Sequence, residues 1–114
     1  LGDLKGIKRY GNFFMPMCEA LTLVAIDICG RSHLIFEVDL INQKIGDFDT
    51  ELIKEFFTAF TNSMNITMHI KTFHGENTHH IIESIFKGFA KALSQAVEID
   101  EKYKDEILST KGIL

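Results

Sequence analysis

Alternating apolar and polar positions predict three strands in the first part of the chain. A short strand is expected within residues 7–14. Residues 19–28 (EALTLVAIDI) alternate clearly in their second half, where Val24 and Ile26 face away from their neighbours, as in a half-buried strand. Residues 33–40 (HLIFEVDL) show a similar alternation. Because a Gly-Arg-Ser turn joins the second and third segments, we expect these two strands to form a hairpin.

A helix is expected next, and its start carries capping residues. Asp49 or Thr50 can act as the N-cap, and acidic residues occupy the first turn, where they interact favourably with the positive end of the helix dipole. The helix is expected to run to about Met64. Its apolar positions have helical spacing and comprise Leu52, Phe56, Phe57 and Phe60.

A further strand and a second helix complete the predicted fold. Residues 66–73 alternate, with Met68 and Ile70 on one face. Residues 78–97 form a second helix, with an apolar stripe of Ile82, Ile85, Phe86, Phe89, Ala92, Leu93 and Ala96. The element order is therefore β-β-β-α-β-α. This order indicates an α+β fold in which both helices pack on one face of an antiparallel or mixed sheet.

Composition narrows the class of protein. The chain has 114 residues, which suits one domain spanning residues 1–114, and 46% hydrophobic with 25% charged residues is ordinary globular composition. Lys and Arg number 12 and Asp and Glu 16, a net charge of −4 that makes the chain a poor candidate for nucleic-acid binding. No apolar run approaches the ~20 residues that cross a bilayer, and the first residues have no apolar signal core. Cys18 and Cys29 form no CxxC pair or disulfide framework. We therefore expect a cytoplasmic protein without nucleic-acid or membrane partners.

The segment 75–87 (GENTHHIIESIFK) carries the candidate chemistry. His79 and Glu83 are four residues apart and share a face of the predicted helix, while His80 and Glu83 are three apart. Adjacent histidines point about 100° apart on a helix, so each can serve a different ion of a two-metal site. Imidazole with carboxylate suits Mn, Fe, Ni or Zn better than Ca or Mg. The alternative is that these are polar residues that cap the helix and face solvent.

Other candidate residues are dispersed along the chain. Any metal site needs further ligands, and Glu55 on the first helix is one candidate, with a solvated helix face as the alternative. His69 is a second, with a hydrogen-bonded structural histidine as the alternative. Basic and hydroxyl side chains can bind a phosphate through charge-assisted hydrogen bonds, whereas solvated surface charge is the ordinary alternative. These side chains are Lys8, Arg9, Arg31, Lys87, Ser109, Thr110 and Lys111.

Several segments resemble one known family, in the same order along the chain. Segment 75–87 is a full match to the second signature of the imidazoleglycerol-phosphate dehydratase family. The other similar segments are 8–11 (KRYG), 16–21 (PMCEAL), 27–31 (DICGR), 46–52 (GDFDTEL) and 109–112 (STKG). The resemblance covers essentially the whole chain. One departure is Cys18, which stands where the family has Asp, whereas Glu19 is retained.

This resemblance implies a fold, an activity and a set of site residues. The fold is the C-terminal half of a chain built from two ribosomal S5 domain 2-like halves. The activity is the dehydration of imidazole glycerol phosphate to imidazole acetol phosphate in histidine biosynthesis, at a site with two manganese ions. The metal ligands implied are Glu55, His79, His80 and Glu83. The residues implied to hold the substrate, mainly its phosphate, are Arg9, Arg31, Lys87, Ser109, Thr110 and Lys111.

The resemblance also implies partners for the chain. The family assembles into a shell of twenty-four subunits, so we expect a homo-oligomer. The first half of the family's chain carries its own His-His-x-x-Glu segment and a glutamate that acts as acid and base, so we expect this chain to need the missing N-terminal half and to be inactive alone. The alternative is a non-catalytic metal-binding half-domain or assembly unit. A metal-dependent hydrolase that uses the same histidines and glutamates is a third interpretation.

Overall fold

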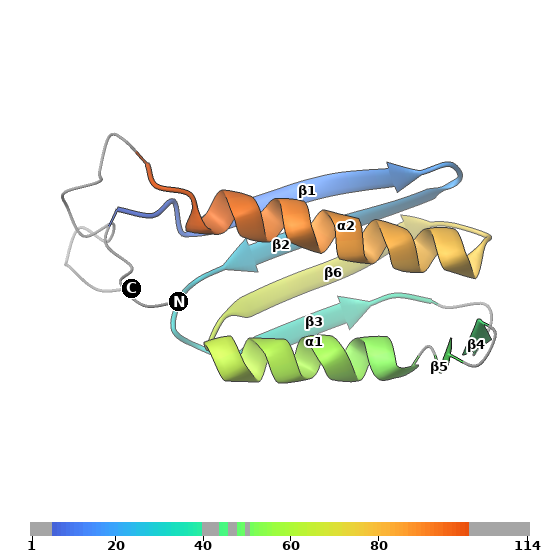
Figure 1. The fold of residues 1–114 in the computed structure, drawn as a ribbon, viewed down its shortest axis with the longest axis horizontal. Helices are drawn as coiled ribbons and strands as arrows, with labels where there is room; N and C mark the ends of the chain where they lie inside the picture. Colours follow the sequence, from blue (N-terminus) through green and yellow to red (C-terminus); the bar gives the residue numbers. More distant parts are fainter. Residues whose placement is uncertain (1–5, 40–43, 46–47, 50, 101–114) are drawn as a thin grey trace.

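The computed structural model describes residues 6–39, 44–45, 48–49 and 51–100 (Figure 1). Its elements, in chain order, are β1 (Tyr10–Met17), β2 (Ala20–Asp27), β3 (His33–Glu37), β4 (Lys44–Ile45), β5 (Phe48–Asp49), α1 (Glu51–Met64), β6 (Thr67–His74) and α2 (Thr78–Val97). The predicted order of the main elements is confirmed. The short strands β4 and β5 were not predicted, and within the described residues they pair only with each other.

The main sheet contains four strands in the order β1-β2-β6-β3. Strands β1 and β6 both pair antiparallel to β2, and β3 pairs parallel to β6. The predicted hairpin between residues 19–28 and 33–40 is therefore wrong. Because β2 already has a neighbour on each edge, β3 cannot pair with it. The helix α1 instead carries the chain from β3 to β6, since adjacent parallel strands need a long crossover connection.

The first strand lies later in the chain than residues 7–14. It begins at Tyr10, and Ile7 forms only an isolated bridge with Ile99, beyond the end of α2. The backbone N–H of Arg9 also donates a hydrogen bond to a carbonyl in the last turn of α2 (3.0 Å). The segment before β1 is therefore bound to the end of α2. Arg9 has a φ of 75°, a left-handed value that is uncommon for residues other than glycine.

Both helices cover the same face of the sheet, as predicted (Figure 1). The helix α2 lies over β1 and β2, and α1 lies along β3. The covered face of the two central strands is mostly apolar, and every second side chain on it points toward the helices. These side chains are at most 3% exposed and include Val24, Ile26, Met68 and Ile70. The alternation predicted for these two strands is thus confirmed.

Phenylalanine side chains join the two helices. The ring of Phe57 on α1 is fully buried, and its centroid lies 5.2 Å from the centroids of both Phe86 and Phe89 on α2. Aromatic pairs in this range add stability beyond their buried area. The apolar stripe predicted for α1 is only partly buried, because Leu52 and Phe56 remain 48% and 47% exposed.

The bounds of α1 and α2 agree with the predicted helices. Of the two caps predicted for α1, Asp49 belongs to β5 and Thr50 lies outside the described residues. Within the described part of the chain, neither helix combines the length and apolar character needed to cross a membrane.

Candidate functional site

The start of α2 carries three of the predicted metal ligands. Asn77 caps this helix, and its side-chain oxygen accepts a hydrogen bond from the backbone N–H of His80 (3.1 Å). The first turn of α2 has no acidic residue. The positive end of its dipole therefore favours an anion supplied from elsewhere in the fold. The ring centroids of His79 and His80 are 6.5 Å apart at an interplanar angle of 69°, and the two rings pair with different carboxylates.

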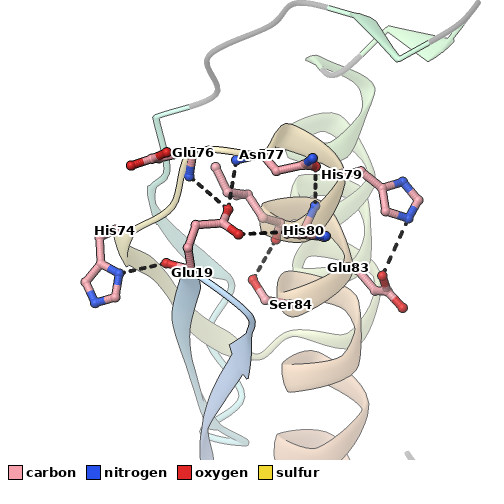
Figure 2. Close-up of polar contacts among 9 residues, drawn as sticks. Glu19, His74, Glu76, Asn77, His79, His80, Glu83 and Ser84 are labelled. Atoms are coloured by element: carbon pink, nitrogen blue, oxygen red, sulfur yellow. Dashed lines mark hydrogen bonds and ion pairs between the residues drawn. The ribbon is translucent and has the colours of Figure 1, made fainter.

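Glu19 supplies this anion from the turn between β1 and β2 (Figure 2). Its Oε2 accepts hydrogen bonds from the backbone N–H groups of Asn77 (2.8 Å) and Glu76 (3.0 Å), and its Oε1 lies 2.8 Å from Nδ1 of His80. These donors, the N–H of Asn77 foremost, lower the pKa of Glu19 from 4.5 to about 2. The Glu19 carbonyl oxygen lies 2.9 Å from Nδ1 of His74 at the end of β6. Glu19 therefore bonds to the end of β6, to the start of α2 and to the predicted metal ligand His80.

His79 has a different carboxylate partner. Its Nε2 lies 3.5 Å from Oε1 of Glu83, one turn further along α2, so the two side chains share a face as their spacing predicts (Figure 2). The other oxygen of Glu83 accepts a hydrogen bond from Nζ of Lys87 (2.9 Å), and this bond lowers the pKa of Glu83. The side chain of His79 is 68% exposed, whereas that of His80 is 32% exposed. The predicted ligands thus comprise an exposed histidine, His79, and two half-buried residues, His80 and Glu83.

A buried chain of hydroxyl groups fixes α2 on the sheet one turn after His80. Ser84 Oγ donates a hydrogen bond to the carbonyl of Ile81 (2.7 Å) and lies 2.7 Å from Thr22 Oγ1 on β2. Thr22 Oγ1 lies in turn 3.1 Å from Thr72 Oγ1 on β6. Thr22 and Ser84 are fully buried. These bonds hold the start of α2 in a defined position above β2 and β6.

Two of the predicted phosphate-binding residues lie far from the start of α2. Arg9 precedes β1, and its Nε donates a hydrogen bond to Asp27 at the end of β2 (2.8 Å). Glu19 follows β1, so the length of this eight-residue strand, roughly 25 Å, separates it from Arg9. Arg31 is exposed in the connection after β2, at the same end of the sheet as Arg9. The predicted residues 109–111 lie outside the described residues.

The remaining candidate ligand, Glu55, is exposed on α1. Among the described residues, no three His, Cys, Asp or Glu side chains lie close enough together to hold one metal ion. The donor types at the start of α2, imidazole and carboxylate, suit manganese. Each ion would need further ligands from outside the described residues or from another chain. His69 is exposed, and its side chain makes no hydrogen bond to the described part of the chain, so the structural side-chain bond considered for it is absent there.

Glu19 and His74 have no role predicted from the sequence, although both contribute to this site. The sequence signal for Glu19 is indirect: the first turn of the predicted helix over residues 78–97 contains two histidines and no acidic residue. The positive end of such a helix is stabilised by a negative charge from another part of the chain. Which carboxylate supplies it depends on the β1–β2 turn lying beside the helix start, 58 residues away from Asn77 in the chain.

The fold and the site define a class of protein: an α+β domain with a mixed four-stranded sheet, two helices on one face and a His-His-x-x-Glu helix start. A family model described as imidazoleglycerol-phosphate dehydratase matches residues 1–93. Over all 114 residues the chain is 54% identical to the imidazoleglycerol-phosphate dehydratase of Clostridium kluyveri and 51% identical to that of a Synechococcus species, and it covers 58% and 56% of these relatives. The chain belongs to the imidazoleglycerol-phosphate dehydratase family.

Solved structures of the same family agree with this assignment. The enzyme from Staphylococcus aureus matches 85% of this chain with a TM-score of 0.83 and 46% identity, and 57% of its own chain is covered. The enzyme from Pyrococcus furiosus matches 95% of this chain with a TM-score of 0.83 and 39% identity, and 58% of its chain is covered. The resemblance found in the sequence is confirmed. The chain spans a little more than half the length of the relatives that it matches.

Proposed function

We propose that this chain forms part of an enzyme that dehydrates imidazole glycerol phosphate to imidazole acetol phosphate in histidine biosynthesis. Its family membership supports this activity. The observation that carries the proposal is the start of α2, where His79, His80 and Glu83 present two imidazoles and a carboxylate on adjacent turns. Since the relatives are longer than this chain, the activity belongs to the complete protein. The N-terminal half is proposed to supply the acid–base glutamate and the remaining ligands.

The metal proposed for this site is manganese, with two ions in the complete site. His79, His80 and Glu83, together with Glu55 on α1, are the proposed ligands of this chain. The two histidines pair with different carboxylates, His79 with Glu83 and His80 with Glu19, and this difference supports separate ions. When bound, manganese supplies Lewis-acid polarisation of the substrate's imidazole ring. Glu19 and Asn77 hold the helix start in place while these ligands act.

The substrate phosphate is proposed to bind basic and hydroxyl side chains through charge-assisted hydrogen bonds. Arg9 is oriented by its bond to Asp27. Arg9 and Arg31 lie at the end of the sheet opposite to His80, and the substrate is much shorter than β1. One copy of the chain therefore cannot bring all of these groups to one substrate, which supports a homo-oligomer with sites shared between copies. The proposed residues are Arg9, Arg31, Lys87, Ser109, Thr110 and Lys111.

The metal assignment is tested by manganese titration of the full 114-residue chain, with free Mn²⁺ measured by electron paramagnetic resonance. The variant His79→Ala is expected to lose binding at one ion. His33→Ala is the matched control, because it removes an exposed histidine of β3 and leaves the start of α2 unchanged. An unchanged manganese stoichiometry in His79→Ala rejects this ligand assignment.

The activity is tested with imidazole glycerol phosphate and manganese, using the chain alone and the chain mixed with a polypeptide that carries the first half of a relative. Turnover that depends on the companion supports the proposed function. Manganese binding without turnover in either sample favours the alternative, a non-catalytic metal-binding half-domain. In the mixture, the Arg9→Ala variant is also expected to show a higher KM for imidazole glycerol phosphate, because it binds the substrate phosphate more weakly.

A further inference from the structure

The two oxygens of Glu19 have different partners, and this division determines how the His80 ring is held. Oε2 accepts two backbone N–H groups, those of Glu76 and Asn77, which can only donate. Oε1 faces Nδ1 of His80 at 2.8 Å. A carboxylate at neutral pH has no proton to give, so the hydrogen bond to His80 forms only when Nδ1 carries the proton. In the neutral ring, Nε2 then carries the free lone pair.

This geometry matters because a metal binds the unprotonated nitrogen of a neutral imidazole. Nε2 of His80 makes no hydrogen bond to the described residues, so it is free to bind a ligand. The partner of His79 is different in kind. Glu83 is itself a proposed ligand, it lies 3.5 Å away, and it also accepts a bond from Lys87. Of the two histidines, only His80 is oriented by a carboxylate that has no proposed metal role.

We propose that Glu19 is a positioning residue, which holds His80 in the tautomer that presents Nε2 to a metal ion. Carboxylates that accept the second N–H of a metal-binding histidine typically contribute 10–100-fold to metal affinity. The inference rests on the proposed role of His80 as a ligand. It adds a residue from the β1–β2 turn to the site, together with a defined chemical task for that residue.

The variant Glu19→Gln tests this task with little change of shape. The glutamine has one oxygen, and the two backbone N–H groups of the helix start require an acceptor. With its oxygen on these two groups, the glutamine turns its NH₂ group toward Nδ1 of His80. Nδ1 must then accept, which places the proton on Nε2 and blocks the metal-binding nitrogen. Glu76→Gln is the matched control, because Glu76 contributes only its backbone N–H and its side chain is exposed.

The first measurement is the tautomer of His80 in the metal-free full chain, by ¹⁵N–¹H correlation spectra of the histidine rings at a pH where imidazoles are neutral. The wild-type chain and Glu76→Gln are expected to show a protonated Nδ1 and an unprotonated Nε2. Glu19→Gln is expected to reverse this assignment. A wild-type His80 that carries its proton on Nε2 overturns the proposal without reference to any variant, so the test does not depend on the folding of Glu19→Gln.

The second measurement is manganese affinity of the same proteins and of His80→Ala. Glu19→Gln is expected to weaken binding at the His80 site by 10–100-fold, whereas Glu76→Gln leaves it unchanged. If His80→Ala binds manganese like the wild-type chain, the proposed ligand fails, and with it this part of the proposed function. If His80→Ala loses the ion but Glu19→Gln retains full affinity, only the positioning role of Glu19 is rejected.

Discussion

The buried hydroxyl chain between the sheet and α2 leads to a prediction about Ser84 and Thr72, which are linked through the hydroxyl group of Thr22. Ser84 has one hydroxyl proton, which it donates to the carbonyl of Ile81. Thr22 must then donate to Ser84, and Thr72 donates to Thr22. If Ser84 is replaced by alanine, Thr22 can reverse its bond and donate to Thr72. If Thr72 is replaced by valine, Thr22 still donates to Ser84. Each single variant therefore leaves the buried hydroxyl of Thr22 with an acceptor.

The double variant removes both acceptors of Thr22, whose side chain is fully buried. Each single variant loses hydrogen bonds worth about 1 kcal/mol net, whereas an unsatisfied buried hydroxyl costs about 1–3 kcal/mol. We therefore expect the loss in free energy of unfolding for Ser84→Ala with Thr72→Val to exceed the sum of the two single losses by about 1–3 kcal/mol. Coupling of this size is ordinarily seen between residues in one network. Here the coupling between Ser84→Ala and Thr72→Val would arise from the hydroxyl group of Thr22, which both residues contact.

The assay is urea unfolding of the four proteins of this cycle, followed by circular dichroism. With a denaturant slope of about 1–3 kcal/mol per molar urea, a coupling of about 2 kcal/mol moves the midpoint of the double variant by about 1 M beyond the additive value. Repeating the cycle in a Thr22→Val background is the control, since the coupling should vanish when Thr22 has no hydroxyl. If the losses in free energy of unfolding of Ser84→Ala and Thr72→Val add within about 0.5 kcal/mol when Thr22 is intact, the reasoning is refuted.

Two further predictions follow from the packing of α2 and from the charge of Glu19. Gly11→Ala should destabilise the protein by about 3 kcal/mol or more in thermal unfolding, because the new Cβ would lie 1.9 Å from the Ala92 carbonyl oxygen. The control is Gly88→Ala, whose Cβ would lie 3.1 Å from Val24 and whose stability should remain within about 1 kcal/mol of wild type. Equal losses in the two variants would contradict the close approach of β1 and α2. The pKa of Glu19 is lowered from 4.5 to about 2, so its carboxylate stabilises the fold above about pH 4.5, and this contribution disappears as the pH falls through about 2. Urea midpoints measured across this range should fall more steeply for the wild type than for Glu19→Gln, and parallel curves would remove Glu19 from the acid dependence.

The candidate site divides into a part that is visible in the sequence and a part that is not. His79, His80 and Glu83 are found from helical spacing alone, because neighbours three and four residues apart on a helix share a face. Glu19 is not found in this way, since its partner His80 is 61 residues away in the chain. The separation of Arg9 from His80 is not visible in the sequence either, because it depends on which end of the sheet each residue lies at.

The amino-acid sequence by itself determined the helices, the buried faces of β2 and β6, and the family. Each of these depends on a pattern within a short window, such as the 3.6-residue period of α2 or the alternation around Val24. Only the tertiary structure decided the strand order, which pairs β3 with β6 instead of β2. It also decided that Glu19 is the carboxylate at the start of α2. The physical reason is the same in both cases: a local pattern indicates which side of an element is buried, but hydrogen-bond partners distant in the chain depend on how the elements are placed in space.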